Sequence, residues 1–362
     1  MTINTLEFAA DDLHVHLRDN NDGRLQLAAP MTARQFGRAL VMPNLVPPVR
    51  TVTEAIAYRE RILRFTDGEF EPLMTLYLTE ASSVDDIMEI VQNPGIVHAI
   101  KYYPAGATTN SDAGVRNIRS MMKFFQHMET NDVVLSLHGE TADPNIDVFD
   151  REKRFIDDDW WHIRHHFPDL RMVLEHITTE EAVKAVQAMQ LLPDYRIVTS
   201  ATITPQHLIA NRNDMLGSGI NPHLYCKPIL KREEDRIALL EVAVSGQPCF
   251  FLGTDSAPHA KHTKENACGC AGCFTGLHAL ELYAEAFDSI GMIDMLPDFA
   301  GKFGADFYGL PLPSKQVKLV REDWVVPTAI DYNGVSYHGE TGAFSVIVPF
   351  YAGETLHWKM VD

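Results

Sequence analysis

Short apolar runs rich in β-branched residues recur along the chain, and longer amphipathic stretches separate most of them. Runs that are apolar throughout are typical of strands covered on both faces, as in a parallel sheet. This pattern predicts eight strands, at residues 13–17, 39–42, 73–78, 99–103, 133–137, 172–174, 196–199 and 249–252.

The stretches between these runs place their apolar residues at helical spacing. The clearest predicted helices cover residues 53–65, 115–128, 179–189 and 233–244. The third has a good start signal, because Glu180 and Glu181 follow Thr178 and Thr179, and acidic side chains favour the first turn of a helix. Eight strands that alternate with helices over about 250 residues are typical of a (β/α)8 barrel, the TIM barrel.

An open, doubly wound sheet is the alternative architecture for the same alternation. Such a sheet carries a glycine-rich turn after its first strand, whereas the first run here ends in His16, Leu17, Arg18 and Asp19. We therefore predict the α/β barrel.

The sequence contains no feature that would separate two domains. It has no Ser/Gly/Pro-rich linker, no low-complexity tract and no internal repeat, but its pattern changes after Gly309 to PLPSKQVKLV and DYNGVSYHGE. We expect one domain over residues 1–362, with a barrel core at about 10–309 and a C-terminal extension at 310–362 packed on the barrel.

Composition and charge narrow the classes of function. The 362 residues are 46% hydrophobic and 22% charged, as in globular proteins, and 31 Lys and Arg against 49 Asp and Glu give a net charge of −18. Such an acidic surface repels phosphate backbones and anionic lipids, so we expect neither a nucleic-acid nor a membrane partner. The N-terminal sequence has no basic, apolar signal pattern, and we expect a cytoplasmic protein.

The cysteines raise the alternative of a structural zinc site. There are five, at positions 226, 249, 268, 270 and 273, and an odd number is not typical of a secreted disulfide framework. Three of them form CGCAGC, which could suggest zinc, but structural zinc sites pair two such knuckles or add histidines at set spacing. The pattern favours an ordinary reduced loop.

The candidate chemistry lies at the ends of the predicted strands. His14, His16 and Arg18 are two residues apart, so they share one face of the first strand, and two imidazoles suit a metal such as zinc. Lys101 lies within the fourth run, and three further polar residues follow other runs: His138, His176 and Asp255. Polar residues at the carboxyl ends of barrel strands form the active site.

Each of these residues also has an ordinary explanation. A buried His can be a hydrogen-bonded core residue, a strand-end Asp can cap the next helix, and a Lys can extend its ammonium group to water. Several such coincidences at strand ends are less economical than one shared site, so we predict a metal-dependent site at the mouth of the barrel.

This arrangement of His, Lys and Asp on barrel strands resembles that of the amidohydrolase superfamily. Longer segments resemble the class II dihydroorotases more closely: LHVHLRD, the MPN of VMPNL, KYYPAGATTNS, LHGE, LEHITT, PHLYCKPILKR and GTDSAPHAKHTKENACGCAGCF. The resemblance runs from about Asp12 to Phe274, and its last two segments separate this group from hydantoinases and phosphotriesterases.

The resemblance implies two zinc ions per chain. The implied ligands are His14, His16, Lys101, His138, His176 and Asp255. His14, His16 and Asp255 would hold the more buried ion, and His138 and His176 the second. Lys101 would bridge both as N6-carboxylysine, because carboxylation turns an amine that cannot bind a cation while protonated into an anionic ligand with two oxygens.

The resemblance also implies the reaction, which is the reversible cyclisation of N-carbamoyl-L-aspartate to L-dihydroorotate and water in pyrimidine biosynthesis. A hydroxide that bridges the two metals would be the nucleophile in the hydrolytic direction, and Asp255 would carry the proton to the ring nitrogen. A homodimer is implied as well.

The substrate carries a carboxylate, for which Arg18 is the natural clamp. The substrate contacts implied by the resemblance are His16, Arg18, Asn44, Thr108, Thr109, His138, Leu224, His259 and Ala271. Leu224 and Ala271 would contribute main-chain groups, and the small-residue loop at 104–114 would close over the substrate.

Two alternatives differ from this assignment. Another cyclic amide or imide hydrolase could use the same metals, but a carboxylate clamp has no purpose with a neutral hydantoin. A catalytically silent scaffold barrel would be expected to have lost metal ligands, whereas all six positions are present here.

Overall fold

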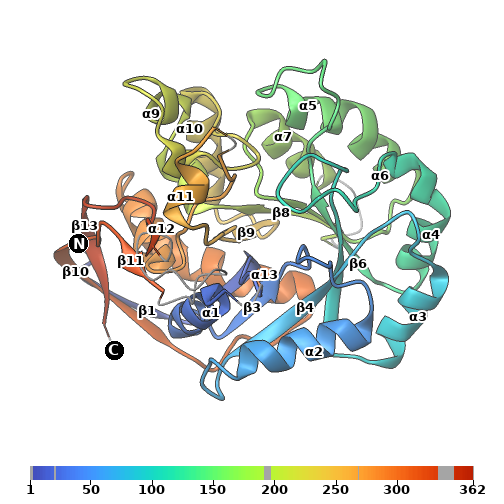
Figure 1. Ribbon diagram of the computed structural model, residues 1–362, viewed down its shortest axis with the longest axis horizontal. Coiled ribbons are helices and arrows are strands. Elements are labelled where there is room, and N and C mark those ends of the chain that lie inside the picture. Colours follow the sequence, from blue (N-terminus) through green and yellow to red (C-terminus); the bar gives the residue numbers. More distant parts are fainter. Residues whose placement is uncertain (1–2, 20–21, 191–196, 268, 333–345, 362) are drawn as a thin grey trace.

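Eight parallel strands form the centre of the molecule, in the order β2 to β9 (Figure 1). The computed structural model describes residues 3–19, 22–190, 197–267, 269–332 and 346–361. The strands are β2 (Asp11–Val15), β3 (Arg38–Val41), β4 (Glu71–Tyr77), β5 (Val97–Tyr102), β6 (Val134–His138), β7 (Met172–Glu175), β8 (Thr199–Ile203) and β9 (Phe250–Leu252). A parallel bridge between Val15 and Ser256 links the first strand to the last, so the sheet closes and the predicted (β/α)8 barrel is confirmed.

The seventh strand was predicted in the wrong place. The prediction was 196–199, whereas β8 spans Thr199–Ile203; residue 196 itself lies outside the described residues. The strand reads TSATI, and the side chains of Thr199, Ser200 and Thr202 are fully buried. An apolar run therefore does not mark this strand, because hydroxyl side chains can be buried inside the barrel where they form hydrogen bonds.

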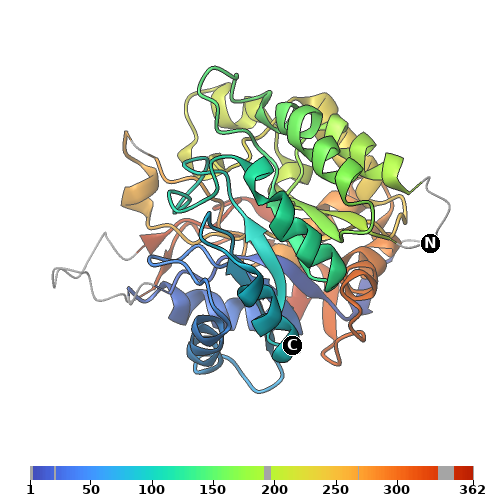
Figure 2. The same ribbon diagram turned by 90° about the vertical axis from the view of Figure 1, so that its right-hand side faces the viewer.

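Helices cover the outside of the barrel (Figures 1 and 2). They are α1 (Arg24–Gln35), α2 (Val52–Leu63), α3 (Val84–Gln92), α4 (Met122–Thr130), α5 (Arg151–Phe155), α6 (Trp161–His166), α7 (Glu180–Met189) and α10 (Glu233–Ala243). Thr179 caps α7, since its side chain accepts a hydrogen bond from Ala182 N, as the start signal predicted. The helix predicted at 115–128 begins later, with a 3-10 turn at Ile118–Met121 before α4, because Val115 instead pairs with Pro104.

Several short helices lie in the connections after β8 and β9. They are α8 (Pro205–Ile209), α9 (Arg212–Leu216), a 3-10 turn at Pro222–Leu224, α11 (Lys261–Lys264), α12 (Ala279–Asp288) and α13 (Phe303–Tyr308). None of the helices in the described part of the chain has the length and apolar character needed to cross a membrane.

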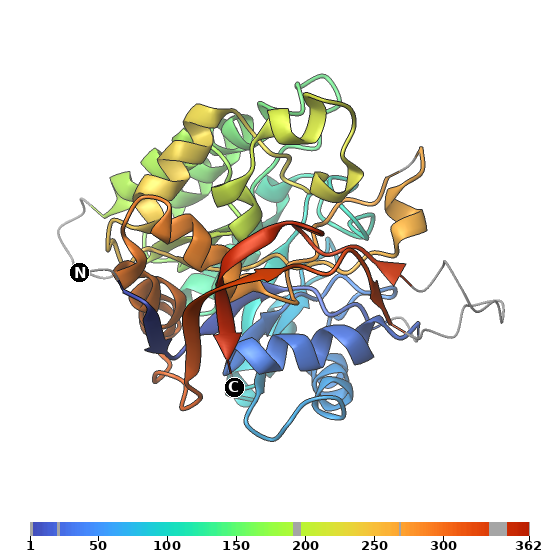
Figure 3. The same ribbon diagram turned by 90° about the vertical axis from the view of Figure 1, so that its left-hand side faces the viewer.

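The two ends of the chain meet in a separate antiparallel sheet of β1 (Thr5–Phe8), β10 (Val317–Val325) and β13 (Thr355–Val361) (Figure 3). A short pair, β11 (Ile330–Asp331) and β12 (Val346–Ile347), accompanies it. The side chains of Trp358 and Met360 on β13 belong to the main hydrophobic core, so this sheet is anchored on the barrel.

The lower interior of the barrel is apolar and is closed by α13. Inward side chains of the strands form a layer with Phe303, Phe307 and Tyr308 of this helix. A Cβ atom on Gly304 would lie 2.0 Å from Leu13 Cδ1, so a larger residue would force the buried Leu13 side chain to move. The polar chemistry is therefore confined to the other end of the barrel.

Candidate metal centre and active site

A polar layer lies directly above the apolar interior. Successive inward positions on a strand are two residues apart. Leu73, Ala99, Val134 and Val173 belong to the apolar layer, and two residues beyond them come Thr75, Lys101, Ser136 and Glu175. All four are buried, and Ser136 Oγ lies 2.5 Å from Glu175 Oε1. The period of the strands thus places Lys101 inside the barrel among polar partners.

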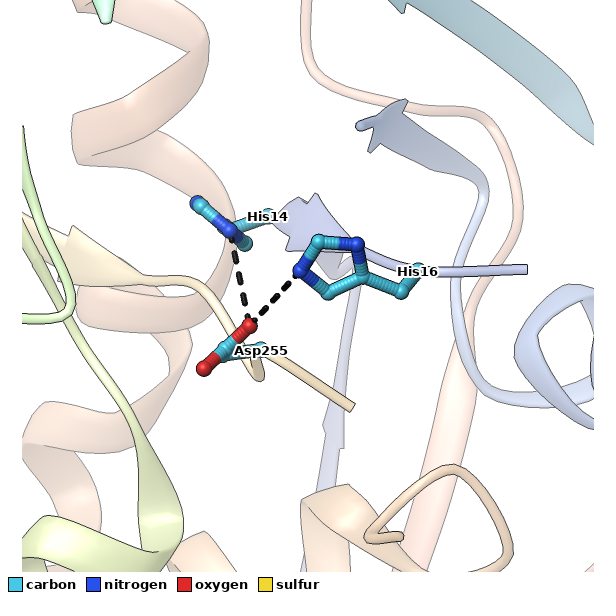
Figure 4. A group of neighbouring side chains, drawn as sticks. All are labelled: His14, His16 and Asp255. Carbon is cyan, nitrogen blue, oxygen red and sulfur yellow. Dashed lines mark ion pairs between the residues drawn. The ribbon is translucent and has the colours of Figure 1, made fainter. Parts of the chain in front are cut away.

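His14, His16 and Asp255 converge in the structure (Figure 4). Asp255 Oδ1 lies 3.0 Å from His16 Nε2 and 3.5 Å from His14 Nε2, and one ligand atom from each residue falls within 4.8 Å of the others. The pairing of β2 with β3 shifts register between Asp12 and Val15, so Leu13 belongs to the inner core although its neighbour His14 faces the site. The first strand was predicted at 13–17, but β2 ends at Val15, so His16 and Arg18 lie beyond it. Alternation along one strand therefore does not by itself explain why these side chains meet.

The other two predicted histidine ligands lie beside this group. The ring centroid of His176 is 4.9 Å from that of His14 and 4.9 Å from that of His138. All three rings are buried. Burial lowers the pKa of His138 and of His176, which keeps these imidazoles in the neutral form that binds a metal.

Lys101 is fully buried, and its Nζ has no hydrogen-bond partner among the described residues. Burial lowers its pKa to about 8, although Glu175 and Asp255 act in the opposite direction. A buried amine without acceptors is costly. Conversion to a carboxylated lysine that shares metal ions would remove this cost, so the residue fits a bridging role on physical grounds.

Two buried carboxylates that the sequence pattern did not single out support the histidines. Glu175 Oε2 lies 2.9 Å from His14 Nδ1, and Glu140 Oε2 lies 2.8 Å from His138 Nε2. Such partners fix the tautomer and orientation of a ligating imidazole and leave its other nitrogen for the metal. The available signal was an acidic residue next to a candidate ligand, in LEHIT and in LHGE.

Three site residues have left-handed backbone conformations, which non-glycine residues rarely adopt. The φ angles are 56° for Arg18, 43° for His176 and 48° for Asp255. Each follows the end of a barrel strand, and the turn directs its side chain toward the mouth. Asp255 N donates to His14 O over 2.8 Å, which holds one of these turns in place. Strained backbone of this kind concentrates at functional sites.

These residues line one cavity at the mouth of the barrel. Its lining comprises His16, Arg18, Asn44, Tyr103, Thr108, His138, His176, Lys227, Asp255, Ala257, Ala271 and Gly272. Burial raises the pKa of the Asp255 carboxyl, but the hydrogen bond from His16 and the proximity of His14 outweigh this, so its pKa is lowered. The carboxylate is therefore ionised and ready to bind a cation.

Two predicted carboxylate-binding groups have unused donors. Arg18 Nε and Nη1, and also His259 Nε2, are buried without a hydrogen-bond partner in the described chain. Burial lowers the pKa of Arg18 only to about 10, so it stays cationic at neutral pH. A buried, charged guanidinium with free donors favours an anionic ligand.

The loop at 104–114 lies over the cavity and is tied down from several sides. Asn44 Nδ2 donates to Thr109 O over 3.0 Å, and Thr109 Oγ1 donates to Ala271 O over 3.3 Å. Lys227 Nζ donates to Ala107 O over 2.9 Å. The structure therefore brings Asn44, Thr109 and Ala271 together, while Leu224 lies in a neighbouring apolar cluster and does not line the cavity.

The cysteine-rich loop forms one wall of this cavity through Ala271 and Gly272. Cys226, Cys249, Cys270 and Cys273 are free thiols, and Cys268 lies outside the described residues.

Comparison with known proteins agrees with this geometry. A model of the amidohydrolase family matches residues 10–300. The chain is 51% identical over 353 residues to a dihydroorotase of Acinetobacter baumannii, covering 97% of both proteins. It is 52% identical over 354 residues to a dihydroorotase of Acaryochloris marina, again with 97% of both covered. The chain belongs to the dihydroorotases of the amidohydrolase family.

Solved structures of dihydroorotases have the same fold. The Saccharomyces cerevisiae dihydroorotase in complex with 5-fluoroorotic acid matches with a TM-score of 0.89 at 31% identity, over 99% of each chain. The Campylobacter jejuni dihydroorotase matches with a TM-score of 0.85 at 35% identity, over 100% of this chain and 99% of that one. An L-hydantoinase from Arthrobacter aurescens, at 14% identity and a TM-score of 0.77, shares the fold alone. Family membership and fold thus agree with the sequence-based prediction.

Proposed function

We propose that this chain interconverts N-carbamoyl-L-aspartate and L-dihydroorotate. The observation that carries the proposal is the coincidence, in one cavity, of four candidate metal ligands with a buried Arg18 whose guanidinium has donors without a partner among the described residues. A cyclic amide that carries a carboxylate satisfies both features. Identity above 50% to dihydroorotases over nearly the whole chain supports the same substrate.

The residues fit two zinc ions. His14, His16 and Asp255 would hold one ion, His138 and His176 the other, and Lys101 in carboxylated form would contact both. Bound there, the ions would polarise the substrate carbonyl and lower the pKa of a water molecule. The neutral imidazoles, the ionised Asp255 and a Lys101 amine that no described residue contacts by a hydrogen bond support this set.

The protein's own groups would orient the substrate. Arg18 and His259 would donate to its carboxylate with the nitrogens that are unused in the structure, and Asn44 would add its amide. His16 and His138 would border the reacting end, and Thr108, Thr109 and Ala271 would contact the ring. Leu224, which lies beside the cavity and not in its lining, would have to reach the ring through its main chain. The Saccharomyces cerevisiae relative binds 5-fluoroorotic acid, a pyrimidine carboxylate, which supports this substrate class.

Asp255 would move the proton. In the hydrolytic direction it accepts a proton from the attacking water and delivers it to the ring nitrogen that leaves the carbonyl carbon; the synthetic direction reverses these transfers. Its carboxylate has the required exposure to the cavity, and its left-handed turn keeps it there.

Three expectations about the whole protein accompany this proposal. We propose one domain, with core 10–309 and extension 310–362, that assembles as a homodimer and acts in the cytoplasm on a small molecule. The resemblance to dihydroorotases supports the dimer and the compartment. The shared core of β13 and the barrel supports the single domain.

A metal count on the purified protein, together with hydrolysis of L-dihydroorotate followed in the ultraviolet, tests the proposal. We expect about two zinc ions per chain and turnover that a chelator abolishes. If the protein binds two metals but does not turn over L-dihydroorotate, it would be reassigned as a hydrolase of another cyclic amide. Failure to bind metal after incubation with zinc and bicarbonate would refute the metal centre itself.

A further inference from the structure

Lys264, at the end of α11, is a buried cation to which the metal and substrate contacts assign no role. Its side chain is only 4% exposed. Its Nζ donates to three main-chain carbonyls: Tyr225 O at 3.0 Å, Cys270 O at 2.9 Å and Gly272 O at 2.6 Å. An ammonium group has three donors, and here each has one acceptor.

These acceptors surround Ala271, a wall residue of the cavity. In a trans peptide the N–H and C=O groups point in opposite directions. Because Cys270 O faces Lys264, the N–H of Ala271 points away from Lys264. Gly272 N donates to Tyr225 O over 2.9 Å, which likewise turns the carbonyl of Ala271 away from Tyr225.

Both main-chain groups of Ala271 are thereby presented on the side of the cavity. Its carbonyl accepts the Thr109 hydroxyl across the cavity mouth, which confirms the direction. An N–H and a C=O presented together by one residue complement the edge of a cyclic amide, where a carbonyl and an N–H are neighbours. Tyr225 O, held by both Lys264 and Gly272 N, is the common anchor of the arrangement.

We propose that Lys264 is a positioning residue that aims the main chain of Ala271 at the ring of the substrate. It acts from behind the loop, touches neither metal nor substrate, and sets affinity for the cyclic amide without affecting the bond-making step. This inference rests on the proposed function and adds a residue to its substrate recognition.

The experiment compares Lys264→Met with Lys261→Met in the zinc-loaded protein, using L-dihydroorotate as substrate. Lys261 lies on the same short helix, but its side chain is 45% exposed and pairs with Glu265. We expect Lys264→Met to raise KM about tenfold or more, with kcat within about threefold of the parent, because binding that is equal in ground and transition states is lost. Zinc content should stay the same, and Lys261→Met should leave both constants unchanged.

An unchanged KM in folded, metal-loaded Lys264→Met would overturn the proposal, as would a fall in kcat that parallels a loss of zinc. If this variant does not fold, Lys264→Gln, which retains two N–H donors, replaces it in the same comparison. Failure of both to fold would make Lys264 a folding residue and overturn its role in recognition. An inactive parent protein would instead refute the proposed function.

Discussion

Asp255 combines two demands on a single side chain. One oxygen approaches the imidazoles of His14 and His16, while the residue also lines the substrate cavity. Its backbone is left-handed, so the chain turns sharply at the point where the carboxylate is needed. A group in this position can bind a cation and exchange a proton with a ligand in the same cavity.

Replacing Asp255 should therefore separate activity from folding. We expect Asp255→Ala to lower kcat for L-dihydroorotate by about 10³-fold or more, because a metal ligand and a proton carrier are lost together. Circular dichroism should show an intact fold. Glu241→Ala, an exposed change on α10, is the matched control. Turnover of Asp255→Ala near that of the parent would disprove the assignment.

At the scale of residues, the candidate ligands could be predicted because each lies near the carboxyl end of a strand or shortly after it. Glu140 was also predictable, since it lies two residues after the His138 that it contacts. Glu175 was not, because its role depends on which imidazole it meets in space. Glu175 contacts His14, which is 161 residues away in the chain, as well as Ser136 and Thr202. Only the closed barrel makes these residues neighbours.

At the scale of elements, a buried carboxyl joins α12 to β13. Glu281 is 2% exposed, and its Oε1 accepts from Met360 N at 3.2 Å. Burial raises its pKa to about 7, from 4.5. Between these values the folded chain holds a proton that the unfolded chain has released, so this residue makes the protein less stable as pH rises through that window.

Glu281→Gln should remove this dependence, because the amide stays neutral at every pH. Relative to the parent, the variant should gain about 2–3 kcal/mol in free energy of unfolding between pH 5 and pH 8. Urea denaturation of both proteins at the two pH values measures the difference. Parallel changes in stability would show that Glu281 keeps an ordinary pKa in the folded protein.

The loop at 104–114 offers a second test at this scale. Tyr77 Oη donates to Asn110 O over 3.2 Å and thus ties the loop to β4. Tyr77→Phe should speed amide hydrogen exchange in the loop by about three- to tenfold, which corresponds to the loss of one hydrogen bond. Tyr58→Phe is the control, since the buried Tyr58 hydroxyl has no partner among the described residues. Equal rates of amide hydrogen exchange for the loop in both variants would show that the Tyr77 hydrogen bond does not restrain it.

The elements that could be predicted are those whose burial is uniform. Strands such as β3 and β6 are mostly apolar, and their predicted positions agree with the structure to within one residue. The predicted position of β8 was wrong because its hydroxyl side chains do not form an apolar run. The pairing of β1 with β10 could not be predicted from local sequence patterns either, because it joins residues about 310 positions apart.

At the scale of the molecule, the proposed metal centre would stabilise the closed barrel. Its candidate ligands lie on or shortly after β2, β5, β6, β7 and β9, so bound ions would link opposite sides of the sheet. A group that binds only the folded state stabilises it by mass action. The buried Lys101 amine, which has no hydrogen-bond partner in the described part of the chain, would otherwise weaken this region.

Removal of the metals should therefore lower thermal stability. We expect chelation to reduce Tm by about 5 °C or more, and zinc with bicarbonate to restore it. Differential scanning calorimetry of the treated and reloaded protein measures the change. His162→Ala, a substitution on the outer helix α6, should respond to the chelator as the parent does. An unchanged Tm after verified metal loss would contradict a structural contribution of the centre.

The distance along the chain between His16 and Asp255 has a consequence for how the protein is made. A ribosome that adds about 5–20 residues each second needs roughly 12–48 s to pass from one to the other. Throughout that time the nascent chain exposes two imidazoles but lacks the carboxylate that completes their set. The strand β1 waits even longer, until β10 has been synthesised. Loading of the proposed metal centre would thus have to follow the synthesis of Asp255, and a chain released before that residue would carry only part of the site.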